Sequence, residues 1–171
     1  PQQRLLLERT QLALHDAQLD RSTLSKNRLV GAFIAIEMND FAEMLKSSPA
    51  GASVYSATGS SDSIACGRLS YVFGLHGPCA SYVTACSAAL TACHGGLRAL
   101  QLHECSDGLV AGASLMLVPG PSALVAAAGM TSPRGRCHTF DSRADGYARA
   151  EACISVALAP VSEGASVSLL G

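Results

Sequence analysis

Five segments of strand length, separated by segments with helical periodicity, limit what this chain can fold into. They cover residues 29–36, 79–84, 109–118, 152–159 and 167–170. The run at 109–118 is apolar without alternation, which is typical of a strand covered on both faces. Because strands that alternate with helices form βαβ units, the sequence predicts an α/β fold with a parallel-rich sheet.

The intervening segments 1–20, 39–46, 60–73 and 88–102 show helix signals, and a short buried helix is expected after Pro119. In 88–102 the polar residues form one narrow stripe, so we expect this helix to be mostly buried. Gly95 and Gly96 each weaken helix propensity by about 1 kcal/mol, and close approach of another backbone is the expected compensation. No repeat or linker is visible, so residues 1–171 are expected to form one domain.

Composition and charge exclude several classes of protein. With 49% hydrophobic and 15% charged residues, the chain is too apolar for intrinsic disorder. A net charge of −1 without any polybasic run gives no basis for binding nucleic acid or an anionic membrane. The uncharged stretch 108–133 resembles a membrane span in length, but Pro119-Gly120-Pro121 divides it, so no span is predicted.

The seven cysteines are an odd number and contain no C-x-x-C pair, so neither a metal site nor a disulfide framework is expected. We interpret them as reduced thiols of a cytoplasmic protein. The chain begins at Pro1 rather than Met, so its natural N-terminus is not visible, and an organelle such as a plastid stays open.

Cys86 is the candidate catalytic residue, because it lies where a buried strand is expected to turn into a helix. The partial positive charge at a helix N-terminus favours a thiolate. Free amide N–H groups of the first helical turn can also donate to a developing oxyanion. Strand-turn-helix presentation of a nucleophile recurs in acyl transfer, whereas the alternative is a small residue filling a core corner.

The segment VTACSAALTACHGG (83–96) resembles the nucleophile motif of β-ketoacyl synthases, usually seen as DTACSSSL. Further blocks resemble the ketosynthase domain of modular (type I) polyketide synthases, in order and at family spacing. They are PQQRLLLE (1–8), YSATG (55–59), IACGRLSYVFGLHGP (64–78) and AGMTSPRGRCHTFDSRADGYARAE (128–151). The resemblance implies a thiolase-like, layered αβαβα fold. The chain corresponds to most of its N-terminal half, without the first strand and the C-terminal half, and Gly171 is expected to be a cut.

By this resemblance, Cys86 accepts an acyl group from the phosphopantetheine of an acyl carrier protein. A malonyl-type extender then decarboxylates, and its carbanion attacks the acyl-Cys86 thioester to give a 3-ketoacyl product. The segment itself is expected to bind no cofactor. The resemblance also implies a homodimer with Cys79–Thr84 at its interface.

Several family features are absent from the sequence. The two catalytic histidines and the lysine of the family lie beyond this chain, so it is not expected to catalyse condensation alone. None of the histidines is assigned a role; they are His15, His76, His94, His103 and His138, the last where the family commonly has Lys. Val83 replaces a common Asp, and Ala150 and Ala152 replace glycines, which strains the loop if those glycines have positive φ.

Other polar groups are interpreted as structural. Cys93 is expected in the core rather than as a resolving thiol, and a salt-bridge network is expected among Asp141, Arg143, Asp145, Arg149 and Glu151. No G-x-S-x-G, G-x-G-x-x-G or Walker motif occurs.

Two other functions stay open, a non-catalytic interaction piece and a different Cys-dependent acyltransferase or hydrolase. The pathway also stays open between polyketide and fatty-acid synthesis, although SATG and TFDSRADGY favour the former.

Overall fold

The computed structural model describes residues 1–24, 28–36 and 39–160. The chain divides into two compact units that interleave along the sequence. Unit 1 contains residues 1–37, 61–113 and 153–171, and unit 2 contains residues 38–60 and 114–152. The expected strand at 167–170 lies outside the described residues.

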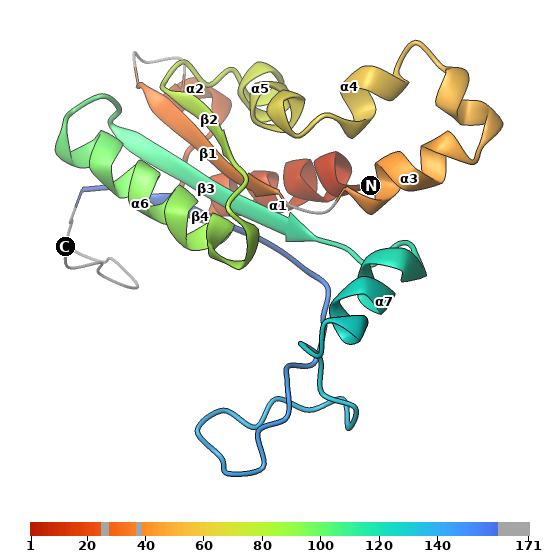
Figure 1. The fold of residues 1–171 in the computed structure, drawn as a ribbon. Helices are drawn as coiled ribbons and strands as arrows, with labels where there is room; N and C mark the ends of the chain where they lie inside the picture. Colours follow the sequence, from red (N-terminus) through yellow and green to blue (C-terminus); the bar gives the residue numbers. More distant parts are fainter. Residues whose placement is uncertain (25–27, 37–38, 161–171) are drawn as a thin grey trace. The chain divides into compact units, whose positions relative to one another are not determined.

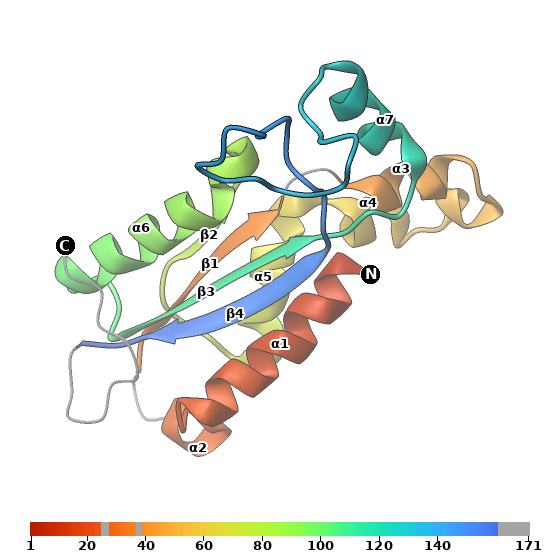
Figure 2. The ribbon, with the colours of Figure 1, turned by 90° about the horizontal axis from the view of Figure 1, so that it is seen from below.

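Unit 1 is built on a four-stranded sheet in the order β2-β1-β3-β4 (Figure 1). The strands are β1 (Val30–Ile36), β2 (Cys79–Tyr82), β3 (Asp107–Ser114) and β4 (Ala152–Leu158). β1 pairs in parallel with both β2 and β3, so that Ala32 lies opposite Cys79 and Leu109. Figure 2 shows β4 running opposite to β3. The predicted α/β class and parallel-rich sheet are confirmed.

Helices cover both faces of this sheet. On one face lie α1 (Gln2–Asp16), α2 (Arg21–Leu24) and α5 (Asp62–Phe73), and on the other lies α6 (Ala88–Gln101) (Figure 2). All seven residues of β1 are buried. Because successive strand residues point to opposite faces, Ile34 packs with α1 and α5 whereas Phe33 packs with α6. Two apolar cores on either side of one sheet therefore hold unit 1 together.

Unit 2 consists of short helices and a long irregular loop. Its helices are α3 (Asp40–Lys46), η1 (Pro49–Ala52), α4 (Ser56–Ser60) and α7 (Pro119–Ala127). The Asn39 side chain accepts a hydrogen bond from the Ala42 N–H and caps α3. α7 has no buried residue, and Leu124 is exposed, so the expected burial of this helix was wrong. A small unit buries only a small fraction of its surface, so α7 stays exposed to solvent.

β3 ends earlier than the apolar pattern indicated. The sequence favoured a strand through Val118, but the strand stops at Ser114. The buried carboxylate of Asp40 accepts the N–H groups of Leu117 at 2.9 Å and of Val118 at 3.4 Å. These amides are therefore satisfied within unit 2 instead of by a neighbouring strand.

No helix in the described part of the chain is long and apolar enough to cross a membrane.

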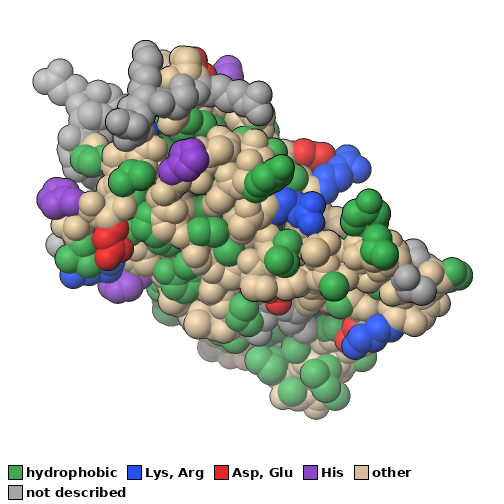
Figure 3. All heavy atoms as spheres, turned by 90° about the horizontal axis from the view of Figure 1, so that it is seen from above, with side chains coloured by type: hydrophobic (Ala, Val, Ile, Leu, Met, Phe, Trp, Pro, Cys, Tyr) green, Lys and Arg blue, Asp and Glu red, His purple; other side chains and the backbone are tan. Residues whose placement is uncertain are grey.

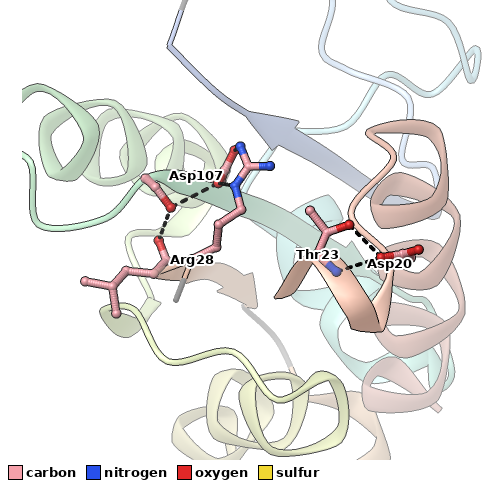
Figure 4. A network of polar contacts seen from close by, with 6 residues as sticks. Asp20, Thr23, Arg28 and Asp107 are labelled. Carbon is pink, nitrogen blue, oxygen red and sulfur yellow. Dashed lines mark hydrogen bonds and ion pairs between the residues drawn. The ribbon is translucent and has the colours of Figure 1, made fainter. Parts of the chain in front are cut away.

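An ion pair between partly exposed Arg28 and buried Asp107 joins the beginnings of β1 and β3 (Figure 4). The Asp107 side chain is 3% exposed and accepts Arg28 Nε at 2.8 Å and a second guanidinium nitrogen at 3.0 Å. Ser106 Oγ donates to the same carboxylate and to the backbone carbonyl of Leu29, each at 3.1 Å. A buried carboxylate paired in this way fixes the register in which the two strands start.

Asp20 caps α2 and gives unit 1 an acid-sensitive contact. Its Oδ1 accepts the Thr23 hydroxyl at 2.5 Å and the Thr23 N–H at 2.7 Å (Figure 4). It also accepts the Ser22 hydroxyl at 2.8 Å. These bonds lower the pKa of Asp20 from 3.8 to about 2. A depressed carboxyl pKa stabilises the fold above the unfolded value, and this contribution is lost as pH falls through the folded value.

We therefore expect the stability difference between the unmodified chain and Asp20→Asn to be constant above about pH 4 and to vanish near pH 2. Thermal unfolding against pH and an NMR titration of the Asp20 carboxyl carbon measure this. Thr23→Val removes the hydroxyl donor and should return the pKa toward 3.8. A titration of the unmodified chain centred at 3.8 would contradict the assignment.

Candidate active site

Cys86 lies where the chain leaves the edge strand β2 and enters α6. After Tyr82, the chain forms a short 3-10 turn, η2 (Ala85–Ser87), and α6 begins at Ala88 (Figure 1). The Cys86 side chain is exposed. The expected turn from a strand into a helix at Cys86 is confirmed, and it places a thiol at the N-terminal end of a helix of 14 residues. The expectation that this strand is buried was wrong, because β2 lies at the edge of the sheet and has no buried residue.

Ala85, immediately before this thiol, has a left-handed backbone with φ +55°. An L-residue pays roughly 1–2 kcal/mol for this conformation, because its Cβ approaches the following carbonyl oxygen. Strained residues of this kind cluster at active sites, and a strained strand-to-helix turn is a known way of exposing a nucleophile. The sequence carries no signal of this feature, since alanine has none of the left-handed preference that glycine or asparagine has.

Hydrogen bonds of hydroxyl groups connect the 3-10 turn η2 with the first turn of α6. The carbonyl oxygen of Thr84 accepts the Ser87 hydroxyl at 2.7 Å and the Ser87 N–H at 3.2 Å. The Thr84 and Thr91 hydroxyls lie 3.1 Å apart, and Thr91 donates to the Ser87 carbonyl at 3.0 Å. We call these three residues the hydroxyl cluster. It holds the backbone on both sides of Cys86.

Replacing Ala85 by glycine is expected to raise the free energy of unfolding by about 1 kcal/mol, because glycine adopts positive φ without the Cβ clash. The same substitution at exposed Ala89, inside α6, should lower it by about 1 kcal/mol. Urea unfolding of both variants measures the difference. Equal losses at the two positions would contradict the strain assigned to Ala85.

α6 packs through a stripe of small residues, Ala88, Ala92, Gly96 and Ala99. Leu90 is 74% exposed, so the expectation that this helix is mostly buried was wrong. The helix covers the sheet with one face only, and the predicted polar positions lie on its other, more open sides. Small residues on the contact face bring the helix axis, and hence the Cys86 turn, close to the sheet.

Gly95 accommodates a side chain and not another backbone as expected, whereas the expected close backbone approach occurs at Gly96, whose Cα would lie 3.9 Å from a Cβ placed on Gly108 of β3. A Cβ at Gly95 would collide with the phenol of Tyr82. A Cβ at Gly96 would lie 3.1 Å from Val110 Cγ2 and 3.3 Å from Phe33 Cδ2. Tyr82 from β2 therefore contacts α6 at Gly95, about one helical turn beyond the hydroxyl cluster. The sequence carries no signal of this contact beyond the glycine pair.

Three of the other cysteines, Cys93, Cys105 and Cys153, are less accessible than Cys86. Cys93 is half-buried and packs against the α6 core, which confirms its prediction as a core residue. Burial raises the pKa of the Cys105 and Cys153 thiols, and a raised pKa lowers the thiolate fraction at neutral pH. Within the described ranges no group of His, Cys, Asp and Glu side chains could hold a metal ion.

The histidines lie at the surface of unit 1, apart from half-buried His138 in unit 2. His15, His76, His94 and His103 are all exposed. The histidine side chains visible in Figure 3 are separated from one another by other side chains.

The charged side chains in the polar loop of unit 2 form separate contacts instead of the one expected network. Arg143 pairs with Asp141 at 2.7 Å and Arg134 pairs with Asp145 at 3.1 Å. Glu151 accepts the Met116 N–H at 2.8 Å, and Arg149 Nε contacts the Met116 sulfur at 3.4 Å. Neither Ala150 nor Ala152 has positive φ, so these alanines introduce no backbone strain.

Comparisons with known proteins show the family to which the chain is similar. Residues 1–164 match the family model "Beta-ketoacyl synthase, N-terminal domain". The chain is 40% identical over 158 residues to a mycocerosic acid synthase-like polyketide synthase of Mycolicibacterium smegmatis. It is also 40% identical over 151 residues to one component of the phenolphthiocerol/phthiocerol polyketide synthase of Mycobacterium tuberculosis. These matches cover 92% and 88% of this chain but only 7% and 10% of the two relatives.

Solved structures give the same result for the fold. The ketosynthase from module 6 of the bacillaene synthase of Bacillus subtilis superimposes with a TM-score of 0.83 at 32% identity, over 94% of this chain and 27% of that one. The oxazolomycin ketosynthase domain of Streptomyces albus gives a TM-score of 0.82 at 31% identity, over 94% of this chain and 28% of that one. The expected thiolase-like fold, present in part, is confirmed by this likeness.

Proposed function

The chain belongs to the β-ketoacyl synthase family, and from this we propose that it carries the acyl-accepting nucleophile, Cys86, of a ketosynthase in polyketide synthesis. The reaction is a decarboxylative Claisen condensation that extends an acyl thioester to a 3-ketoacyl thioester. The observation that carries the proposal is the exposed Cys86 thiol between left-handed Ala85 and the N-terminus of α6.

In the first step, the Cys86 thiolate attacks the carbonyl carbon of an acyl thioester presented on the phosphopantetheine of an acyl carrier protein. The tetrahedral oxyanion accepts hydrogen bonds from free N–H groups at the start of α6. Collapse of the oxyanion expels the carrier thiol and leaves the acyl group on Cys86.

In the second step, a malonyl-type thioester loses carbon dioxide, and the resulting carbanion attacks the acyl-Cys86 carbonyl. The Cys86 thiolate leaves, and the product stays on the carrier, longer by the two backbone carbons of the extender. The residues that assist decarboxylation are assigned to the remainder of the domain, because no histidine of this chain lies in a family motif.

The test is to incubate the complete ketosynthase that carries this sequence with an acyl thioester and to locate the acyl mass. Trypsin releases residues 69–98, which contain Cys79, Cys86 and Cys93, so fragment ions must distinguish the three thiols. We expect the acyl group on Cys86 alone, with and without a Cys93→Ser substitution. Acyl mass on another residue defeats the assignment, and acylation without malonyl decarboxylation favours a different Cys-dependent acyltransferase.

We further propose that Cys79–Thr84 lies at a homodimer interface. β2 is an edge strand of the sheet, so one row of its backbone N–H and C=O groups has no strand partner within the described part of unit 1. Val83, just beyond the strand, is 57% exposed. Pairing of two such edges across a two-fold axis would satisfy both rows.

Val83→Glu is expected to convert the dimer into a monomer, because a desolvated carboxylate at the interface centre is costly. Size-exclusion chromatography with light scattering measures the mass. The matched control is Leu102→Glu, at the C-terminal end of α6, where the side chain is 58% exposed. A dimer that survives Val83→Glu would contradict this interface.

The cytoplasmic location stays a prediction.

A further inference from the structure

The hydroxyl cluster of Thr84, Ser87 and Thr91 forms a closed ring of hydrogen bonds around the Cys86 turn. A hydroxyl group has a single hydrogen to donate. Thr91 donates its hydrogen to the Ser87 carbonyl oxygen at 3.0 Å, so Thr84 is the donor in the 3.1 Å contact between the Thr84 and Thr91 hydroxyls. Ser87 in turn donates to the Thr84 carbonyl oxygen at 2.7 Å, and its oxygen lies 3.1 Å from the Thr84 hydroxyl. All three hydrogens are therefore used within the cluster.

Two members of the cluster occupy positions where another arrangement would favour the helix more. Ser87 is the N-cap of α6, but its side chain caps no N–H group of the described first turn and donates to Thr84 instead. Thr91 lies inside α6, where a β-branched residue lowers helix propensity and a hydroxyl bonded to the carbonyl four residues earlier slightly destabilises the helix. The arrangement therefore stabilises the turn rather than the helix.

Left-handed Ala85 is the part of the turn that needs this support. A strained backbone conformation persists only where its surroundings over-determine it. The cluster holds the chain directly before Ala85, at Thr84, and directly after Cys86, at Ser87. Thr91 connects both points to the body of α6, because it contacts the Thr84 hydroxyl and the Ser87 carbonyl oxygen.

We propose that Thr91 is a positioning residue, which keeps Ala85 left-handed and thereby presents the Cys86 thiol at the start of α6. The inference rests on the proposed function in taking Cys86 as the nucleophile. Without the Thr91 hydroxyl, the turn relaxes to an ordinary backbone conformation and the thiol leaves its reactive position. None of these hydrogen bonds requires an accessible group, so they are compatible with the proposed homodimer interface, which includes Thr84.

The experiment replaces Thr91 by valine in the complete ketosynthase, which keeps the shape of the side chain and removes the hydroxyl. Alkylation of Cys86 by iodoacetamide and its acylation by an acyl thioester should both slow about tenfold, the factor to which the strain of one left-handed residue corresponds. The midpoint of urea unfolding should not fall, because relief of the strain offsets the lost hydrogen bonds. Thr91→Ser, which keeps a hydroxyl, should restore both rates.

A double substitution separates positioning of Cys86 from a general structural role. In Ala85→Gly the left-handed backbone carries no strain, so the addition of Thr91→Val should slow alkylation of Cys86 less than Thr91→Val does alone. The matched control is Thr10→Val in α1. The Thr10 hydroxyl is buried and has no hydrogen-bond partner in the part of the chain that the structure describes, so this variant should alkylate Cys86 at the unmodified rate.

Several outcomes would overturn the inference. Alkylation of Cys86 at the unmodified rate in Thr91→Val would do so, as would an equal effect of Thr91→Val with and without Ala85→Gly. A slower rate that Thr91→Ser does not restore, or a lower unfolding midpoint in Thr91→Val, would show a structural role alone. Failure of the proposed function is distinguishable, because the acyl group would then be found on a residue other than Cys86 in the unmodified protein, whatever the effect of Thr91 on alkylation.

Discussion

Cys86→Ala in the complete ketosynthase is expected to abolish condensation, with kcat/KM at least roughly 10³-fold lower, because the acyl-enzyme can no longer form. The substitution removes one sulfur from an exposed site, so the fold should be retained. The turn itself is held by the hydroxyl cluster of Thr84, Ser87 and Thr91, which the substitution does not touch. Turnover of an acyl thioester with a malonyl thioester, followed by product mass, measures the loss.

The matched control is Cys93→Ala, seven residues further along the chain. Cys93 is half-buried against the α6 core, so its loss should lower stability slightly and leave turnover nearly unchanged. Condensation that survives Cys86→Ala would show that another group accepts the acyl chain. Equal losses in the two variants would indicate a general defect of α6 instead of a missing nucleophile.

The sheet was largely predictable because its signal is local. β1 and the first part of β3 are apolar on both faces, and the structure covers both faces with helices. The end of β3 was not predictable. Leu117 and Val118 are as apolar as the strand before them, but their N–H groups bind Asp40, 77 and 78 residues earlier in the chain. A pattern read within a short window cannot reveal such a competitor.

At the candidate site, too, the features with a local signal were predictable and the contacts between distant residues were not. The position of Cys86 was predictable, since an extended segment, a turn and a helical stripe follow one another in the sequence. The left-handed Ala85 was not, because this backbone is imposed by its surroundings at a residue with no preference for it. The contact between Tyr82 and Gly95 is likewise tertiary, and its only sign in the sequence is the glycine that leaves space for the phenol ring.

Gly77→Ala is expected to be the most destabilising small substitution in unit 1, lowering the free energy of unfolding by about 3 kcal/mol. Gly77 lies in the connection between α5 and β2, and its N–H donates to the Val30 carbonyl oxygen at 3.0 Å. A Cβ at this position would lie 2.6 Å from the Gly31 nitrogen and 2.7 Å from the Val30 oxygen. These atoms are backbone of the central strand β1, which cannot move aside without disturbing its pairing with β2 and β3.

Gly67→Ala is the matched control, because it adds the same methyl group only ten residues away. Gly67 lies inside α5, and a Cβ there would meet nothing within 4 Å. The added methyl should therefore stabilise the chain by about 1 kcal/mol through helix propensity alone. Urea unfolding of the two variants should give changes of opposite sign. An unchanged free energy of unfolding in Gly77→Ala would show that the connection does not lie against the backbone of β1. The position assigned to β2, and to the Cys86 turn that follows it, would then be wrong.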